Sequence, residues 1–365
     1  MAFTVGPGWL VGSGFSVIGG FVLNGFTSPA SMNGSSAVSF MNAVAVNSAG
    51  LYVAVGYDTS GAPLYATSSN GSTWTTPARM NGSASQARMY GITVNSAGLF
   101  VAVGSVTNTA NPVYATSANG STWTTPAAIN GVASDKVMRS VTVNSAGLFV
   151  AVGYDNLNFG SPVYATSTDG STWTTPAAMN GSTAIATMNA VTVNSSGLFV
   201  AVGYDSIGAA VYATSANGST WTTPARMNSS AASARMLGIA VNASGLFVSV
   251  GYTTSTGATV YSTSTNGSNW ITPVSLGGSN GFLNGIAVNS AGQFAAVGRE
   301  QTTYYPIYAS TIDGSTWTTP ARMNGSTTAA TMNGIAANPS GLFAAVGFFG
   351  DGTGLGLPGV YATST

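Results

Sequence analysis

The chain has 365 residues, of which 8 are basic and 8 are acidic, so its formal net charge at pH 7 is zero. A neutral chain has no basic field to attract nucleic acid or an anionic membrane, and we expect neither as a partner. Because the chain contains no Cys and no His, disulfides, thiolate metal sites and histidine acid–base chemistry are excluded, and we expect no cofactor.

The N-terminal segment is apolar and rich in glycine. Residues 5–22 read VGPGWL, VGSGFS and VIGGFV, a six-residue period with Trp9, Phe15 or Phe21 in fifth place. So much glycine disfavours a membrane-spanning helix, and the segment lacks the charged start and cleavage site of a secretory signal. We expect no membrane insertion, and release by a route other than ordinary secretion.

Aromatic residues at this density favour contact with a partner surface. We therefore assign residues 1–23 to a docking arm that attaches the chain to other virion or assembly subunits through residues 1–22. A disordered tail is the alternative.

Residues 24–365 are built from one repeat of about 49 residues. Its first part, VNSAGLFVAVG in one copy, occurs seven times, with its Asn at Asn47, Asn95, Asn144, Asn194, Asn242, Asn289 and Asn338. Its second part places a tyrosine at Tyr65, Tyr114, Tyr164, Tyr212, Tyr261, Tyr308 and Tyr361. Its third part, NGSTWTTPARM, occurs six times, and the missing copy is at the N-terminal end, where FTSPASMNG puts Phe26 in the place of Trp.

Each repeat is expected to form four short strands, here called A to D, which in the first copy cover residues 41–47, 51–56, 63–68 and 72–77. Strand B is a continuous apolar run, as in strands covered on both faces. An Asn-Gly or Asp-Gly turn after strand C is a strong hairpin signal, and the proline that ends strand D suits an outer edge.

Four-stranded repeats of this length predict an all-β protein, a seven-bladed β-propeller. The N-terminal strand would complete the C-terminal blade and close the ring. Six of the repeats carry a methionine in strand A, with Leu283 in the seventh place, and we expect this ladder to be core packing.

The loops divide between two faces of the predicted ring. The A–B and C–D turns are nearly uniform, whereas the B–C and D–A loops vary in length and hold most of the charges. Loops on a rigid scaffold carry binding residues, and Tyr-Asp pairs suit sugars, although a turn-forming Asp beside a packing Tyr is the alternative. The residues expected to bind ligand are Tyr57, Asp58, Tyr154, Asp155, Tyr204, Asp205, Arg299, Glu300, Tyr304 and Tyr305. Arg79, Arg226 and Arg322 are expected to cover blade edges with their stems rather than to grip an anion.

The C–D hairpin resembles the Asp-box, or BNR, repeat of sialidase-type propellers, S-x-D-x-G-x-T-W. It reads STDGSTW at Ser167–Trp173, with copies at Ser68–Trp74, Ser117–Trp123 and Ser215–Trp221. The spacing is one residue shorter, and Asn replaces Asp in four of six copies. The sialidase family uses an arginine triad, a Tyr–Glu nucleophile and an Asp acid. Only Glu300 near Tyr304 and Tyr305 is similar, so we predict no catalytic residues and no enzyme.

Taken together, these features favour a structural or recognition protein of an extracellular particle, most plausibly a phage tail, fibre or decoration protein, whose general style resembles repeat-rich virion proteins. Its partner would be a cell-surface glycan or receptor, bound through the B–C and D–A loops. A secreted bacterial lectin or adhesin is the alternative, and a glycosidase is a third.

Overall fold

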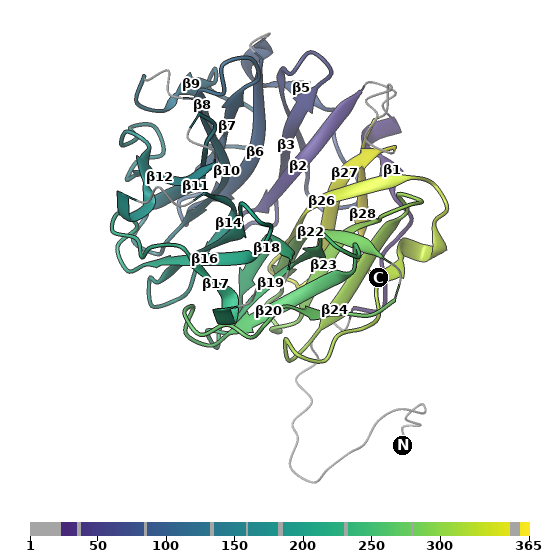
Figure 1. Cartoon of the computed structure of the whole chain (residues 1–365). Coiled ribbons are helices and arrows are strands. Elements are labelled where there is room, and N and C mark those ends of the chain that lie inside the picture. The colour runs from purple at the N-terminus through teal and green to yellow at the C-terminus, as the bar shows by residue number, and fades with distance from the viewer. Residues whose placement is uncertain are drawn as a thin grey trace, which may run out of the picture.

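The strands form seven antiparallel four-stranded sheets arranged as the blades of a ring (Figure 1). The computed structural model describes residues 23–34, 38–83, 86–131, 135–157, 160–181, 185–229, 233–278, 280–350 and 358–365. The all-β, seven-bladed propeller predicted from the repeats is confirmed. Trp9, Phe15 and Phe21 lie outside these residues, so the docking arm and its boundary stay predictions.

Each blade runs from strand A on the inside to strand D on the outside. The first three blades are β2 (Ser39–Val46), β3 (Tyr52–Asp58), β4 (Pro63–Ser68) and β5 (Ala78–Arg79); β6 (Ala87–Val94), β7 (Phe100–Val106), β8 (Pro112–Ser117) and β9 (Ala127–Ala128); and β10 (Lys136–Val143), β11 (Phe149–Asp155), β12 (Ser161–Ser167) and β13 (Ala177–Ala178).

The other blades continue the same order around the ring. They are β14 (Ala186–Val193), β15 (Phe199–Asp205), β16 (Ala210–Ser215) and β17 (Ala225–Arg226); β18 (Ala234–Val241), β19 (Phe247–Thr253), β20 (Thr259–Ser264) and β21 (Val274–Ser275); β22 (Gly281–Val288), β23 (Phe294–Glu300), β24 (Pro306–Thr311) and β25 (Ala321–Arg322); and β26 (Ala330–Ala337), β27 (Phe343–Phe349), β28 (Gly359–Thr363) and β1 (Ala30–Ser31). Single-turn 3-10 helices follow six of the D strands: η1 (Met32–Gly34), η2 (Met80–Gly82), η3 (Ile129–Gly131), η4 (Met179–Gly181), η5 (Met227–Ser229) and η6 (Met323–Gly325).

Strand D is shorter than predicted and begins later. In the first blade the predicted strand 72–77 is a turn and an irregular segment, and only Ala78 and Arg79 pair with strand C. The Trp74 side chain folds back, and its Nε1 donates to the Gly71 carbonyl at 2.7 Å, so this segment closes the C–D turn instead of extending the sheet. The neighbouring Thr75 still makes one backbone bond to strand C, because its N–H donates to the Thr67 carbonyl oxygen at 2.9 Å.

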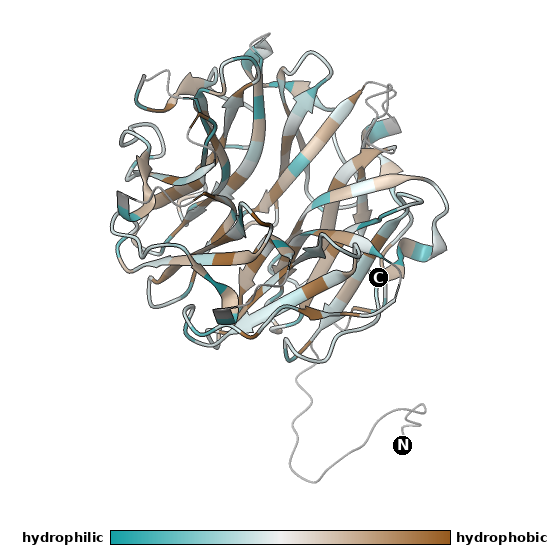
Figure 2. Cartoon of the chain, in the orientation of Figure 1, coloured by the Kyte–Doolittle hydropathy of each residue, from teal (hydrophilic) through white to brown (hydrophobic). Residues whose placement is uncertain are grey.

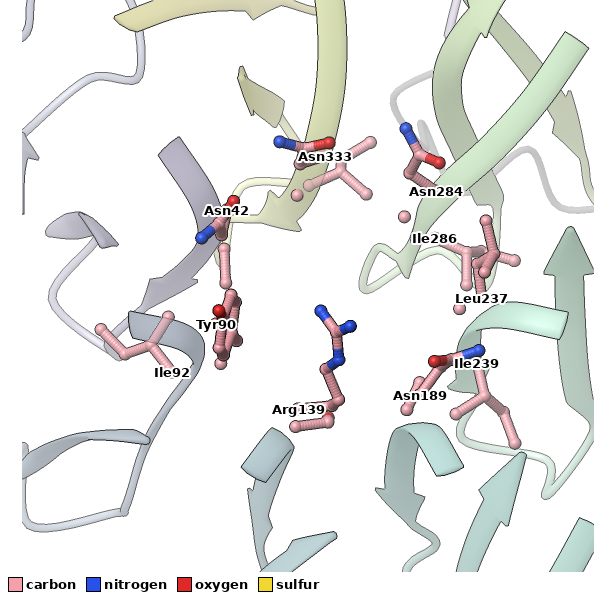
Figure 3. Close-up of a pocket in the computed structure, with 18 of the residues that line it drawn as sticks. Asn42, Tyr90, Ile92, Arg139, Asn189, Leu237, Ile239, Asn284, Ile286 and Asn333 are labelled. Atoms are coloured by element: carbon pink, nitrogen blue, oxygen red, sulfur yellow. The ribbon is translucent and has the colours of Figure 1, made fainter. Parts of the chain in front are cut away.

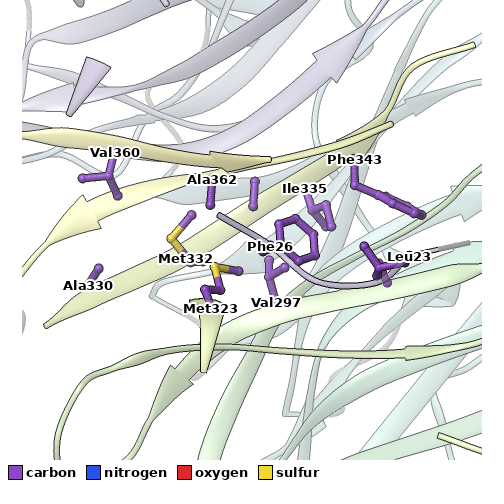
Figure 4. Packing of buried hydrophobic residues seen from close by; sticks show 12 residues of the cluster. Leu23, Phe26, Val297, Met323, Ala330, Met332, Ile335, Phe343, Val360 and Ala362 are labelled. Atoms are coloured by element: carbon purple, nitrogen blue, oxygen red, sulfur yellow. The ribbon is translucent and has the colours of Figure 1, made fainter. Parts of the chain in front are cut away.

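The N-terminal strand closes the ring, as predicted. Ala30 and Ser31 of β1 pair with Tyr361 and Val360 of β28. Phe26 is 2% exposed and packs with the buried residues of the last blades (Figure 4). Its ring centroid lies 5.3 Å from that of Tyr308, the kind of contact that tryptophans make with tyrosines elsewhere in the ring. The last blade therefore has a fourth strand that covers β28, as strand D covers strand C in the other blades.

The core lies between the blades, and Figure 2 shows the hydrophobic segments concentrated in the strands. The methionine ladder of strand A is buried core, as predicted: Met41, Met89, Met138, Met188, Met236, Met332 and Leu283 are 0% exposed. No helix among the described residues is long and apolar enough to cross a membrane.

Candidate functional site

A central cavity of about 260 Å³ is lined by the A strands of all seven blades. The residue after each ladder position forms a ring around it, which we call the channel ring: Asn42, Tyr90, Arg139, Asn189, Leu237, Asn284 and Asn333. A β-bulge directly after each ladder residue turns these side chains out of the alternating strand pattern. The channel is therefore walled by a bulge that every blade repeats.

The four asparagines of the channel ring tie neighbouring blades together. Each donates its Nδ2 to the carbonyl of the ladder methionine in the next blade. The bonds run from Asn42 to Met89 at 2.7 Å, Asn189 to Met236 at 2.8 Å, Asn284 to Met332 at 2.9 Å and Asn333 to Met41 at 3.0 Å. The amide oxygens accept no bond from the rest of the described chain, so they remain available as acceptors in the cavity.

Arg139 is the one charged member of the channel ring. Figure 3 shows its guanidinium directed to the middle of the cavity, with the asparagines around it. Its Cζ lies 5.0 Å from the ring centroid of Tyr90 and 5.5 Å from that of Tyr154. Its Nε is buried without a hydrogen-bond partner among the described residues.

At the mouth of the channel, the residue before each ladder position pairs across strands A and B. We call these pairs the mouth ring: Phe40–Tyr57, Arg88–Ser105, Val137–Tyr154, Thr187–Tyr204, Arg235–Tyr252, Phe282–Arg299 and Thr331–Phe348. The mouth lies on the face of the B–C and D–A loops, where strand A begins and strand B ends. Aromatic and arginine side chains therefore gather at one end of the channel.

The mouth-ring arginines stack on aromatic rings. Arg88 lies over Tyr57 of the preceding blade, with Cζ 4.6 Å from the centroid, and Arg235 lies over Tyr204 at 4.5 Å. Arg299 lies over Phe282 at 4.8 Å and over Tyr304 at 4.3 Å. Cation–π stacking holds the flat face of a guanidinium and leaves its N–H edge free to donate. Burial raises the pKa of Tyr57, although Arg88 and Arg139 pull it down.

The predicted Tyr-Asp pairs are brought to this face, but their carboxylates are occupied. Asp58 Oδ1 accepts from the N–H groups of Ser60 and Ala62, and its Oδ2 accepts from Arg79 Nε at 2.9 Å. Burial raises the Asp58 pKa, but the bonds from Ser60 and Arg79 outweigh it, so the pKa lies below its ordinary value.

Asp205 repeats the arrangement of Asp58, whereas Asp155 pairs with a lysine of strand A instead of an arginine of strand D. Asp205 accepts from the Ile207 and Ala209 N–H groups and from Arg226 at 2.7 Å, and Asp155 pairs with Lys136 at 3.2 Å. These aspartates hold their own loops, whereas Tyr57, Tyr154 and Tyr204 stand half-buried at the mouth. Sugar binding by the pairs stays a prediction.

Glu300 lies apart from the channel mouth. Its carboxylate accepts from Arg322 Nε at 2.8 Å and Nη2 at 3.1 Å and from the Thr303 hydroxyl. The bond from Arg322, with that from Thr303, lowers the Glu300 pKa. Tyr305 stacks on Arg322 at 4.3 Å. Of the four residues predicted in this loop, Arg299 and Tyr304 face the mouth together and Glu300 and Tyr305 meet at Arg322.

The strand D arginines act differently from the prediction. Arg79, Arg226 and Arg322 were expected to cover blade edges with their stems, but each guanidinium pairs with the acidic side chain at the end of strand B in its own blade. A short D strand that ends in arginine places the charge beside the B–C loop. These ion pairs fix the loops that surround the mouth.

A second hollow lies beside the mouth, on the fourth and fifth blades. This groove has a volume of about 360 Å³ and is lined by Ile185, Ala186, Thr187, Tyr204, Asp205, Ser206 and Arg235. It offers an aromatic ring, a guanidinium and a hydroxyl within one concave surface. Such a mixture of apolar wall and a few polar groups is typical of small-molecule sites.

Sequence reasoning missed Arg88, Arg139, Arg235, Phe282 and the asparagines of the channel ring. The residues directly before and after each ladder methionine differ in polarity and charge from one repeat to the next, although the rest of strand A is nearly uniform. This variation within a strand is the sequence feature that indicates the two rings, and the prediction considered variation in the loops alone. Among the described residues, no group of three or more acidic side chains could hold a metal ion.

No protein-family model matches the chain, and no curated protein sequence matches it. Solved structures with a similar fold include the BP39L lectin from Burkholderia pseudomallei, with a TM-score of 0.63 at 14% identity over 88% of this chain and 95% of that one. A polysaccharide lyase of the ulvan lyase family PL25, bound to -[GlcA(1-4)Rha3S]-, gives 0.56 at 11% identity over 94% of each chain. The NanB sialidase from Streptococcus pneumoniae gives 0.54 at 14% identity over 93% of this chain and 70% of that one.

These matches correct one prediction. The chain was expected not to be an enzyme, but a lyase and sialidases share its propeller, which contradicts that expectation. At these identities the matches show the fold alone. Propellers of this architecture include both a lectin and carbohydrate-active enzymes.

Proposed function

We propose that this propeller binds carbohydrate at the channel mouth, on the face of the B–C and D–A loops. The observation that carries the proposal is the mouth ring, which gathers half-buried tyrosines and arginines that form no ion pair in the described structure at one end of a cavity. Aromatic faces pack against the C–H faces of sugars, and fixed donors and acceptors bond their hydroxyls. Similar propellers that bind or act on carbohydrate support the same class of ligand.

The rigidity of the mouth supports this use. Each B–C loop with an ion pair is braced on strand D of its own blade or on Lys136, and the blades are tied by the channel-ring asparagines. A braced surface loses little conformational entropy when a ligand binds. The mouth is therefore preorganised.

The biological setting remains a separate proposal. A cell-surface glycan is the proposed partner, and an extracellular particle such as a virion, or secretion, is the proposed location. Support comes from the low charge and the aromatic arm of residues 1–22. Finding the chain on purified particles from its native source would test this setting.

A glycan microarray with the purified chain tests the binding site. We expect binding to at least one carbohydrate class, with an affinity loss of about tenfold or more in Tyr204→Leu, because the platform of the groove is removed. Ile312→Ala is the matched control, since Ile312 is an exposed apolar residue (69%) in a C–D turn on the opposite face. Absence of binding to every glycan, or equal loss in both variants, would contradict the proposal.

A further inference from the structure

Four of the eight cations form no ion pair with any acid in the described part of the chain. Arg79, Lys136, Arg226 and Arg322 form ion pairs, whereas none of the arginines of the mouth and channel rings pairs with an acid in the described structure. These four, which we call the arginine ring, are Arg88, Arg139, Arg235 and Arg299.

Each member of the arginine ring also has a buried nitrogen without a hydrogen-bond partner. The atoms are Nε in Arg88, Arg139 and Arg235 and Nη1 in Arg299. A charged group that is partly buried and lacks partners is costly. All four side chains are half-buried, so an anion that bonds the exposed part of the guanidinium offsets part of that cost. Stacking on aromatic rings aligns the guanidinium groups but does not satisfy these N–H groups.

Six of the seven acids of the described chain are placed where they cannot serve these arginines, and the seventh, Asp135, forms no ion pair in the described structure. Asp58, Asp155, Asp205 and Glu300 are held by the four ion pairs, and Asp169 and Asp313 lie in C–D turns on the opposite face. With Asp135, the loop face holds eight described cations against five described acids, a net of +3. Among the described residues the mouth is therefore cationic, and a concave low-dielectric wall focuses its field.

We infer that the carbohydrate bound at the mouth is anionic, carrying carboxylate or sulfate groups, and that Arg139 holds one such group inside the channel. This inference rests on the proposed function. The guanidinium edge matches a carboxylate or sulfate with two parallel bonds. The amide oxygens of Asn42, Asn189, Asn284 and Asn333 surround it and accept from sugar hydroxyls.

The size of the cavity limits what enters it. Its 260 Å³ is below the roughly 300–1,000 Å³ of pockets for drug-sized ligands. It admits a single sugar unit or its anionic group, so the rest of a chain would lie across the mouth ring. There Arg88, Arg235 and Arg299 meet further anionic groups.

Calorimetric titration with paired probes tests the inference. The first pair is oligogalacturonate and its carboxyl-reduced neutral form, and the second is a sulfated galactan oligosaccharide and its desulfated form. We expect at least one acidic probe to bind about tenfold or more tightly than its neutral partner, and to weaken as salt rises. Galacturonate monomer and inorganic sulfate show whether the anionic group alone suffices.

The variant Arg139→Met is compared with Ile312→Ala, which changes an exposed side chain in a C–D turn on the opposite face. We expect about a tenfold or greater loss of acidic-probe binding in Arg139→Met and less than a twofold change in the control. A thermal melt of each variant separates loss of binding from loss of fold, and Arg139→Lys serves in its place if Arg139→Met does not fold.

Four outcomes count against the inference in different ways. Equal binding of acidic and neutral probes overturns anion selectivity and leaves carbohydrate binding standing. Wild-type binding by Arg139→Met overturns the role of Arg139. Binding of inorganic sulfate as tight as that of any oligosaccharide, or binding of no carbohydrate at all, overturns the proposed function itself.

Discussion

At the scale of single residues, one glycine in strand B of every blade is required by a close backbone contact. A Cβ on Gly104 would lie 1.9 Å from the Arg88 carbonyl oxygen, because the bulge in strand A pushes that carbonyl toward strand B. The glycine therefore makes room for the bulge, and the bulge turns the channel ring into the cavity. The repeated VAVG of the sequence has this steric origin.

We predict that Gly104→Ala destabilises the protein by about 4 kcal/mol or more, or prevents folding, because backbone atoms would collide. The control is Gly98→Ala in the preceding turn, where φ is +86° and no atom lies within 4 Å of the added Cβ. It is expected to cost only about 1–2 kcal/mol of conformational strain. Urea denaturation measures both, and similar costs would contradict the steric account.

Asp169 in a C–D turn gives a prediction about pH. Backbone N–H groups of Thr172 and Ser171 bond its carboxylate and lower its pKa from 3.8 to about 2. A lowered folded pKa adds stability that is complete above 3.8 and lost as the pH falls through about 2. In the C–D turn of the second blade, Asn119 takes the place of Asp169 and accepts the corresponding bonds from the N–H groups of Ser121 and Thr122.

The Asp169→Asn variant should therefore fold normally. It should be less stable than wild type at neutral pH, and the difference should shrink as the pH is lowered from 4 toward 2. Urea midpoints across this range measure it, with Asn119→Asp as the converse variant, expected to gain stability at neutral pH. A difference that stays constant at all pH values would show that the charge makes no contribution.

At the scale of strands, the bounds of a strand could be predicted from the sequence where residues with fixed backbone preferences mark its two ends. Strand C of the first blade was predicted at its observed bounds, because Pro63 begins it and the Asn-Gly turn ends it. Strand D was misplaced because Trp and Thr favour strands by type. In the structure the Trp side chain instead closes a turn by bonding Gly71, which residue preferences do not reveal.

Threonine side chains replace part of the missing ladder between strands C and D. The Thr116 N–H donates to Thr124 Oγ1 at 2.9 Å, and the Thr124 N–H donates to the Thr116 carbonyl at 2.9 Å. The same exchange occurs in five other blades, including the last one, where Thr363 and Thr27 make it. The repeated TTP is thus explained by a hydroxyl acting as a backbone acceptor.

We predict that Thr124→Val costs about 1–3 kcal/mol, because the part-buried Thr116 N–H loses its acceptor while the volume is unchanged. Thr124→Ser keeps the hydroxyl and should cost clearly less. Chemical denaturation of the two variants checks the difference. Should both cost the same, the methyl group and not the hydrogen bond would be responsible.

The candidate site was only partly visible in the sequence. The variable loops indicated the correct face, and the tyrosines of the Tyr-Asp pairs do stand at its mouth. The loop aspartates proved to be occupied by ion pairs that cross the blade, and such pairs depend on the register of strand D. Arg139 was not predicted because an alternating strand pattern does not show that a bulge turns its side chain inward, and the strand B glycine that makes room for the bulge reveals this only in the structure.

At the scale of the whole molecule, closure of the ring depends on twelve described residues at the N-terminal end, 23–34. They supply β1, the buried Phe26 and backbone bonds such as Asn24 N–H to the Thr365 carbonyl at 3.0 Å. Both ends of the repeat region therefore belong to one blade. A free edge would otherwise remain on β28, and such an edge invites pairing with another chain.

We predict that deleting residues 1–34 lowers the melting temperature and promotes association, because β28 loses its partner. Phe26→Ala should cost about 3–5 kcal/mol for the lost core volume.

Deleting residues 1–22 should leave a folded monomeric propeller that no longer attaches to its assembly. Thermal melts and size-exclusion chromatography distinguish these cases, and a short deletion that unfolds the protein would contradict the separate role of the arm.

The central claim is that the mouth of the channel, rather than the uniform face or the blade rim, binds carbohydrate. A crystal structure of the chain with the tightest-binding oligosaccharide tests this claim most directly. It should show a sugar unit at the channel ring, with its anionic group on the guanidinium of Arg139 and the rest of the chain against the mouth-ring tyrosines. A sugar bound at the C–D turns or between the outer strands, with the channel mouth empty, would contradict it.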